Sequence, residues 1–336
     1  MTKKYVLAID LMSGDYGIEV SIPATIQLVN SCTDKNLAFL LIGDKKSYNL
    51  YAKELSNISQ IEYVFAEEII TMEEEPSKAI RKKDSSMRVM IELIKEGRAD
   101  GGLSAGNTGA LMMLSHLLIK PIQGIIRTAI CAPFPTLYGK TWVLDLGANV
   151  VCEPINLYQF AIMSHALVSA TDFTESPSIS LLNVGSESHK GSPLVQETSK
   201  LLEKSLLNYK GFIEGDTIFT NKSDIVITDG FTGNSVLKAC EGLARYLIHE
   251  TKREVSKNIM LKIFGLMALP MLLKLKNKYD PSNYNGASFL GLNKIIIKSH
   301  GSTNIKGFKN AIQIAIQQIK ADLPNQIEQK IKYYNN

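Results

Sequence analysis

Short runs of β-branched and other apolar residues alternate with amphipathic stretches along almost the whole chain. This alternation is typical of a parallel sheet whose strands are joined by crossover helices. The pattern predicts strands at residues 5–9, 37–42, 61–65, 101–104, 142–146, 179–184, 225–228 and 295–298. We therefore expect an α/β fold, a three-layer α/β/α sandwich with a mostly parallel sheet, in one large domain over residues 1–336.

The amphipathic stretches predict the helices between these strands. They predict helices at residues 77–95, 110–118 and 157–168, one opened by Pro193, one starting at about Ser235, and a last one with the core face Phe308, Ala311, Ile312, Ala315, Ile316 and Ile319. The last helix shows the clearest helical period. The helix at 77–95 carries three successive basic residues, Arg81 to Lys83, which we expect to face water.

Five of these units place a Gly-rich polar loop between a strand and a helix, at residues 105–109, 147–149, 185–191, 229–234 and 299–304. In a parallel sheet, loops at the carboxyl ends of the strands line one crevice, and helix N-termini there direct N–H groups at the ligand. Several such loops with few acidic residues favour an anion site. The repetition indicates a substrate that carries phosphate.

Two common nucleotide-binding motifs are missing from the sequence. No G-x-x-x-x-G-K-[ST] occurs, and Asp10–Asp15 stands where G-x-G-x-x-G would follow the first strand. Gly102–Gly106 does match G-x-S-x-G in a strand, turn and helix context, and Asp229 and His300 follow in triad order. An α/β-hydrolase-type thioesterase with Ser104 as nucleophile is therefore the rival hypothesis.

Composition adds few constraints. The net charge of +4 is too small to indicate nucleic acid, and 45% hydrophobic with 21% charged residues is typical of a globular enzyme. The four cysteines lack metal-binding spacing, so we expect reduced, mostly buried thiols and neither a metal nor a cofactor. The first ten residues turn acidic before a signal-length apolar stretch accumulates, which favours a cytoplasmic location.

The longest uncharged apolar run, residues 263–273, lies between Lys262 and Lys274. It is too short to span a bilayer, which needs about 20 apolar residues. Residues 254–282 therefore read either as an amphipathic helical tip that lies on a membrane or as a buried hairpin or dimer interface. The candidate membrane-contact residues are Ile263, Leu266, Met267, Met271 and Leu272.

Several of these segments together resemble one known family. They are Ser104–Met112, Asp145–Asn149, Gln159–Met163, Asp229–Asn234 and Lys298–Ser302, together with Ser77–Arg81, Asp84–Met87 and Leu290–Asn293. In this order, from about Leu7 to Ile316, they look like the signature segments of the bacterial phosphate acyltransferase family (PlsX).

The resemblance implies an enzyme of phospholipid synthesis that joins inorganic phosphate to the acyl group of acyl-[acyl-carrier protein]. It implies a fold like that of phosphate acetyltransferases and isocitrate-dehydrogenase-like enzymes, a homodimer, and peripheral association with the inner face of the cell membrane through the apolar tip. A membrane glycerol-3-phosphate acyltransferase would receive the acyl phosphate. A basic surface, at Arg81–Lys83 or at Arg253 and Lys257, would meet the acidic carrier. A non-catalytic membrane or carrier-protein adaptor is the third hypothesis.

The sequence departs from the family pattern at several positions. Leu11, Ser13 and Tyr16 replace usual residues of the first loop, Val151 stands where the family usually has aspartate, and Ser288 replaces a proline. Any essential role for a group at positions 13, 16 or 151 is therefore not expected here.

With a phosphate dianion as nucleophile and a thiolate as leaving group, the protein has mainly to hold an anion and stabilise an oxyanion. The candidate catalytic residues are Lys190, His300, Asn234 and Asn107, and the candidate binding residues are Asp10, Ser104, Gly106, Thr108, Gly109, Asn149, Asp229, Gly230, Thr232 and Gly233.

These candidates divide by role. Asn107, Thr108, Thr232 and Asn234 are proposed side-chain donors, while Lys190 and His300 would neutralise charge or protonate the leaving sulfur. Lys190 as a solvated loop lysine and His300 as a helix cap are the structural alternatives. Asp10, Asp145 and Asp229 are expected rather to brace loop N–H groups, and Asn149 reads equally well as a turn residue.

Overall fold

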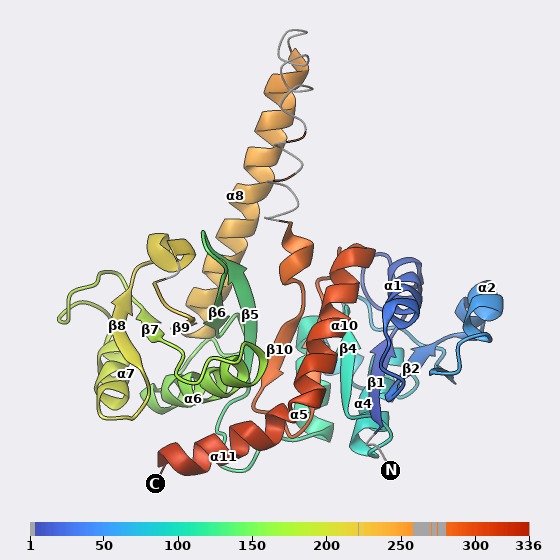
Figure 1. The fold of residues 1–336 in the computed structure, drawn as a ribbon, viewed down its shortest axis with the longest axis horizontal. Coiled ribbons are helices and arrows are strands. Elements are labelled where there is room, and N and C mark those ends of the chain that lie inside the picture. The colour runs from blue at the N-terminus through green and yellow to red at the C-terminus, as the bar shows by residue number, and fades with distance from the viewer. Residues whose placement is uncertain (1–3, 221, 258–269, 271–273, 275–279, 336) are drawn as a thin grey trace.

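The computed structural model describes residues 4–220, 222–257, 270, 274 and 280–335. These residues form one eleven-stranded sheet with helices on both faces (Figure 1). The strands are β1 (Tyr5–Asp10), β2 (Leu37–Gly43), β3 (Ile61–Phe65), β4 (Gly101–Ser104), β5 (Ala129–Pro135), β6 (Lys140–Leu144), β7 (Ile179–Leu182), β8 (Tyr209–Ile213), β9 (Ile225–Ile227), β10 (Ala287–Leu290) and β11 (Ile295–Lys298).

The helices are α1 (Ile18–Ser31), α2 (Lys45–Leu55), α3 (Pro76–Ala79), α4 (Ser86–Lys95), α5 (Thr108–Leu118), α6 (Pro154–Thr171), α7 (Pro193–Glu203), α8 (Gly230–Lys257), α10 (Ile305–Lys320) and α11 (Leu323–Asn335). Two 3₁₀ turns cover Gly215–Thr220 and Pro281–Tyr284. All eight predicted strands are present within a residue or two of their expected ends, and three further strands, β5, β8 and β10, were not predicted.

The sheet is built from two parallel sets that run in opposite directions. The strand order is β3-β2-β1-β4-β11-β10-β5-β6-β9-β7-β8. The first five strands are mutually parallel, as are the last four. Three antiparallel pairs, β11 with β10, β10 with β5 and β5 with β6, reverse the direction between the two sets. The expected mostly parallel sheet is confirmed, but its carboxyl ends do not all point the same way.

The register places the two sets of strand ends around one central row of residues. The row runs through Ile9, Leu103, Ile297, Ser288, Cys131, Leu144 and Ile227. β1, β4 and β11 end one residue past this row, and β6 and β9 end on it, running the other way. The loops that follow therefore leave the row in opposite directions. The expectation that all the Gly-rich loops line one crevice assumed a single strand direction, whereas here the carboxyl ends reach the same row from two opposite directions.

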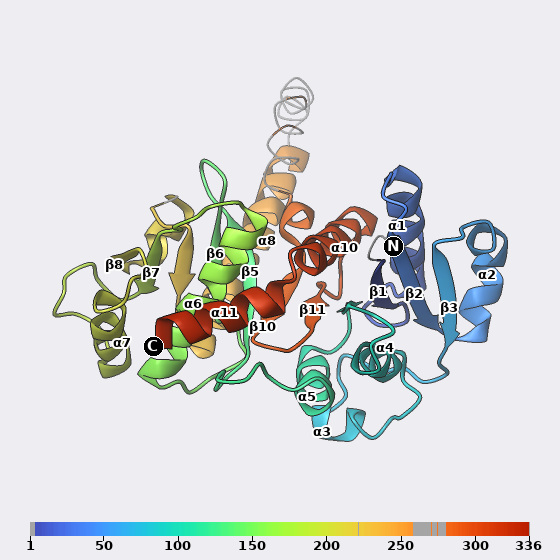
Figure 2. The same ribbon diagram turned by 60° about the horizontal axis from the view of Figure 1, so that its bottom comes forward.

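Side chains of each central strand alternate between two apolar cores, as the pleat requires. In β11, Ile295 and Ile297 pack into the core beneath α1 and α10, whereas Ile296 faces the core of α4 and α5. The first turns of α8 pack on this second core through Val236 and Leu237. The side chain of Lys298 lies on the same face of the sheet as that of Ile296, the face whose core includes α4, α5 and the start of α8. Figure 2 shows α4 and α5 side by side.

Two helix boundaries differ from those expected. The stretch 77–95 forms two helices, α3 and α4, because Ser85 starts α4 by accepting the N–H of Arg88 at 3.4 Å. Of the three basic residues between them, Arg81 and Lys83 are exposed, as predicted. Lys82 is half-buried and donates to Glu74 at 2.8 Å, which makes the prediction wrong for that residue.

The second difference is at α8, which begins at Gly230 rather than near Ser235. Its C-terminal part extends away from the sheet (Figure 1). No helix among the described residues is long and apolar enough to cross a membrane. The predicted membrane-contact residues Ile263, Leu266, Met267, Met271 and Leu272, with most of segment 254–282, lie outside the described residues. Of the four cysteines, all free, only Cys131 is fully buried, so the prediction of mostly buried thiols is wrong for the three that are half-buried.

Candidate functional site

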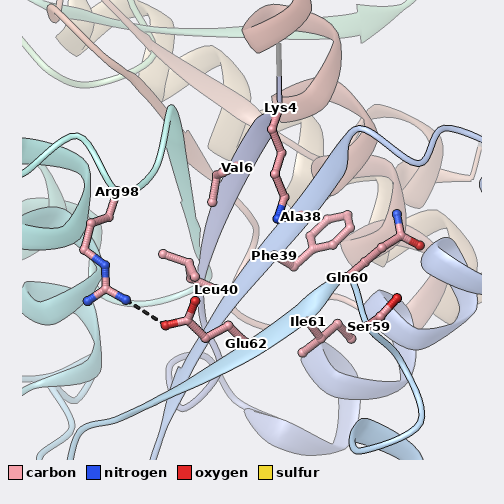
Figure 3. A pocket seen from close by; sticks show the side chains of 10 residues that line it. All are labelled: Lys4, Val6, Ala38, Phe39, Leu40, Ser59, Gln60, Ile61, Glu62 and Arg98. Atoms are coloured by element: carbon pink, nitrogen blue, oxygen red, sulfur yellow. Dashed lines mark hydrogen bonds and ion pairs between the residues drawn. The ribbon is translucent and has the colours of Figure 1, made fainter. Parts of the chain in front are cut away.

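A cavity of about 230 Å³ lies at the amino ends of β1, β2 and β3 (Figure 3). Its wall includes Lys4, Phe39 and Gln60, and the charged pair Arg98 and Glu62 is joined at 2.7 Å. The Gly-rich loops after β1, β4 and β11 start at the other ends of these strands. We therefore look for the functional site at the carboxyl ends, where those loops meet.

A buried polar cluster, consisting of Asp10, Ser86, Ser104 and Lys298, joins the carboxyl ends of β1, β4 and β11. Asp10 is fully buried, and its carboxylate accepts the hydroxyl of Ser86 at 2.6 Å and that of Ser104 at 2.7 Å. It also accepts the N–H of Met12 at 3.3 Å. Asp10 thus braces the loops from within, the role expected for it from the sequence.

Lys298 is the cluster's cation, and sequence reasoning missed it as a site residue. Its side chain donates to the backbone oxygen of Ala105 at 3.1 Å and to that of Ser299. Desolvation lowers the pKa of Lys298 to about 8, while the nearby carboxylates of Asp10 and Asp15 act in the other direction. The sequence signal was a lysine that closes a β-branched strand directly before a Gly-rich loop.

The hydroxyl of Ser104 is not placed as a nucleophile. Ser104 is the last residue of β4, is fully buried, and donates to Asp10 rather than to a histidine. The other proposed member of the triad, Asp229, accepts both the N–H and the hydroxyl of Thr232, at 2.9 and 2.7 Å. The predicted Ser104–Asp229–His300 triad is therefore wrong, and the G-x-S-x-G match reflects a tightly packed turn.

The loop after β4 uses its small residues for close packing and capping. A Cβ at Gly106 would stand 2.8 Å from the Ser13 side chain, so only glycine fits there. Asn107 accepts the N–H of Ala110 at 3.1 Å and donates to the backbone oxygens of Met72 and Glu74 at 3.0 and 2.9 Å.

The Asn107 side chain is therefore fully engaged in this structure: its oxygen caps α5 and its NH2 group donates to the backbone of Met72 and Glu74. Thr108 and Gly109 begin that helix, half-buried and exposed respectively. Their backbone N–H groups belong to the first turn, where α-helices leave N–H groups without intrahelical partners. They are the atoms of this loop best placed to meet an anion.

His300 lies at the open end of the polar cluster, with its side chain half-exposed. Its Nδ1 is 3.0 Å from the Ser302 hydroxyl, and its Nε2 is 3.8 Å from the carboxylate of Glu241 on α8. Desolvation lowers its pKa, against the opposing effect of Glu241. α10 is capped by Asn304, which accepts the N–H of Gly307 at 2.8 Å, so the alternative of His300 as the helix cap is wrong.

A second loop cluster surrounds Asp145, which is fully buried just after β6. Its carboxylate accepts five N–H groups, those of Ile130, Gly147, Ala148 and Asn149 and the side-chain amide of Asn149, at distances from 2.7 to 3.2 Å. Burial raises the pKa of Asp145, and the hydrogen bonds oppose that rise. Asn149 also donates to Thr128 at 2.8 Å, so it acts as a turn residue.

The start of α8 packs directly against this second cluster. The N–H of Gly230 donates to Asn149 at 2.8 Å, and Asp229 caps the helix through Thr232. A Cβ at Gly147 would stand 3.3 Å from the Asn234 side chain, so the exposed Asn234 packs against the loop after β6. The segment Gly230–Asn234, expected to be a loop, is the first turn of the helix.

Lys190 lies apart from both clusters, on the loop between β7 and α7. Its ammonium pairs with Glu187 at 2.7 Å, and this hydrogen-bonded carboxylate raises its pKa. Both side chains are more than two-fifths exposed. The structure shows it as a solvated loop lysine, the alternative noted from the sequence, with no contact to the polar cluster among the described residues.

The residues that depart from the family pattern differ in solvent exposure. Ser13 is only 3% exposed, packs against Gly106, and its hydroxyl has no partner among the described residues. Tyr16 and Val151 are 53% and 83% exposed. The missing carboxylate at position 151 therefore removes a surface group and leaves the bonds of Asp145 intact.

The structure thus brings the predicted residues into two groups joined by one helix. Asp10, Ser104 and His300 gather around Lys298, whereas Asn149, Asp229 and Asn234 gather around Asp145. α8 starts at the second group and runs back to the first, where Glu241 meets His300. The N-terminal half of α8 therefore connects the two groups.

The sequence profile of the family described as "Fatty acid synthesis protein" matches residues 5–326. The chain belongs to this family. It is similar to the phosphate acyltransferase of Legionella pneumophila strain Corby, with 46% identity over 99% of this chain and 98% of that one. The phosphate acyltransferase of Methylococcus capsulatus is 44% identical over 97% and 96% of the two chains. The resemblance drawn from the signature segments is thereby confirmed.

Several solved structures share the fold of this chain. EutD phosphotransacetylase from Staphylococcus aureus superposes with a TM-score of 0.60 at 16% identity, covering 94% of each chain. A branched-chain phosphotransacylase from Enterococcus faecalis V583 gives 0.54 at 12% identity, covering 94% of this chain and 99% of that one. The expected phosphate acetyltransferase-like fold is confirmed.

Proposed function

We propose that the chain transfers the fatty acyl group of acyl-[acyl-carrier protein] to inorganic phosphate, giving acyl phosphate and free carrier protein. The observation that carries this proposal is the 46% identity to a phosphate acyltransferase over nearly the whole of both chains. The fold shared with phosphotransacetylases, which the structure shows independently, supports it.

The chemistry makes modest demands on the protein. An oxygen of the phosphate dianion attacks the thioester carbonyl carbon, the C–S bond breaks, and the thiolate leaves with the electron pair and takes up a proton. An appreciable share of inorganic phosphate is already dianionic near neutral pH, and thiols have a pKa of about 8.5, so neither a strong base nor a strong acid is required. What remains is to hold an anion beside a carbonyl and to stabilise the oxyanion.

The polar cluster around Lys298 is the proposed phosphate end of the site. The N–H groups of Thr108 and Gly109 and the ring of His300 lie at its open side, where they would contact the anion and the leaving sulfur. Asn234 and Thr232 on α8 are proposed to act on the thioester side. No metal or cofactor takes part in this proposal.

The assay that tests the proposal follows release of carrier thiol from acyl-carrier thioester, with and without inorganic phosphate, and traps acyl phosphate with hydroxylamine. We expect thiol release that depends on phosphate and matches the acyl phosphate trapped. Release that ignores phosphate and disappears in Ser104→Ala would show a thioesterase. Tight carrier binding without any turnover would show an adaptor.

We further propose a homodimer that works at the inner face of the cell membrane and delivers acyl phosphate to a membrane glycerol-3-phosphate acyltransferase. The apolar, lysine-flanked run at 263–273 supports membrane contact. Large apolar side chains exposed along α8 support association of two copies. They are Leu243, Tyr246, Leu247 and Ile248, each between 55% and 60% exposed.

Leu247→Glu is therefore expected to shift the protein from dimer to monomer, because it places a charge in the centre of the apolar stripe on α8. Sedimentation velocity at several protein concentrations measures the shift. Lys252→Glu, also exposed on α8 but outside the stripe, is the control and is expected to stay dimeric. A wild-type protein that sediments as a monomer would refute the dimer.

A further inference from the structure

Lys298 joins two loops that the proposed function needs in one place. Its ammonium donates to Ala105, in the loop after β4, and to Ser299, in the loop after β11. The same loops are linked by the N–H of Ser299, which donates to the backbone oxygen of Ser104 at 2.9 Å. The pairing of β4 with β11 sets the base of the spacing between these loops, and beyond the strand ends the Lys298 side chain, only 8% exposed, adds a link between them.

The charge on Lys298 has no full counterpart in this structure. No ion pair among the described residues includes it, and its hydrogen-bond acceptors are neutral carbonyls. The nearest acid, Asp10, already accepts two hydroxyl groups, from Ser86 and Ser104. A buried cation with only neutral partners is costly, and an anion bound between the loops would offset that cost.

Four charged or titratable groups face Lys298 from the surrounding elements. Asp10 on β1 and Asp15 in the loop before α1 favour its charged form, whereas Lys238 on α8 opposes it. His300, two residues further along, is half-exposed and titrates below its ordinary pKa, so it is neutral over the alkaline range. The pKa of about 8 places the loss of the Lys298 proton just above neutrality.

We propose that Lys298 is a positioning residue for the phosphate substrate: its ammonium fixes the Ala105 and Ser299 loops at the spacing that receives the anion, so that phosphate binding requires the protonated lysine. This inference rests on the proposed function, because it concerns the phosphate of the same site. The protein would then lose phosphate affinity in mildly alkaline solution while its affinity for the acyl carrier stays unchanged.

The test measures binding of inorganic phosphate by calorimetry between pH 7 and pH 9, with each Kd expressed on the concentration of the phosphate dianion, because the dianion fraction itself rises over this range. For wild type we expect the Kd to rise about tenfold over this range. The reason is that the protonated fraction of a group with a pKa of about 8 falls about tenfold between pH 7 and pH 9. Lys298→Met should bind phosphate about tenfold more weakly at pH 7 and show no such pH dependence. Lys252→Met, which alters an exposed lysine on α8 that is not among the groups acting on Lys298, should keep the wild-type slope.

Each outcome separates this inference from a general loss of structure and from the proposed function. A wild-type Kd that is constant with pH, or a folded Lys298→Met that keeps the wild-type slope, would overturn the role of Lys298. The wild-type pH series decides the question even if Lys298→Met does not fold. If the wild type instead neither binds phosphate nor releases thiol in response to it, the proposed function fails.

Discussion

Asp145→Ala is expected to destabilise the protein by about 3–5 kcal/mol, because it removes a fully buried carboxylate that accepts five N–H groups. Alanine supplies no replacement acceptor at this fully buried position. The loss also frees the turn at Asn149, whose backbone oxygen receives the first N–H of α8. We therefore expect activity to fall together with stability.

Urea unfolding followed by circular dichroism measures the effect. Asp229→Ala is the matched control, since this half-buried aspartate caps the start of α8 and its loss should cost only about 1 kcal/mol. Equal losses in the two variants would mean that the hydrogen bonds of Asp145 contribute no more than a helix cap does. A variant that unfolds at the wild-type urea concentration would contradict the assigned role.

Local sequence pattern predicted every strand of the parallel units except β8, because their apolar runs are followed by a loop and a helix. It missed β5, whose sequence contains Pro133 and Pro135, residues that are typical of loops. It also missed β10, four residues long. These are the strands that reverse the sheet, and their pairing joins residues more than 150 positions apart, such as Cys131 and Ser288. No local pattern encodes such a partner.

The candidate site was predictable only as far as residue type and position along the strands allow. The loops at Asp10, Ser104 and His300 do meet, as their places after parallel strands indicated. The direction of each side chain could not be predicted from the sequence. Asn107 caps α5, and the Ser104 hydroxyl donates a hydrogen bond to Asp10, 94 residues away. Lys298 was overlooked because a lysine at a strand end usually reaches solvent, and only the packing of α4 and α5 buries it.

Gly233→Ala is expected to cost about 3 kcal/mol or more, because a methyl group there would overlap the backbone oxygen of Asp145. The same methyl would stand 3.0 Å from the Thr228 side chain, so the helix cannot move away in that direction either. The obstacle is backbone that Asp145 holds in place through its own hydrogen bonds. α8 must shift instead, which would displace Asn234 and reduce turnover as well as stability.

Gly242→Ala makes the identical chemical change nine residues further along the same helix, where no atom lies within 4 Å of the added methyl. There the substitution should stabilise α8 by up to about 1 kcal/mol, because alanine loses less backbone entropy than glycine in a helix. Thermal unfolding of the two variants should therefore move in opposite directions. Shifts of the same sign would mean that the first turn of α8 is not held against the loop after β6, and the arrangement that joins the two loop clusters would have to be revised.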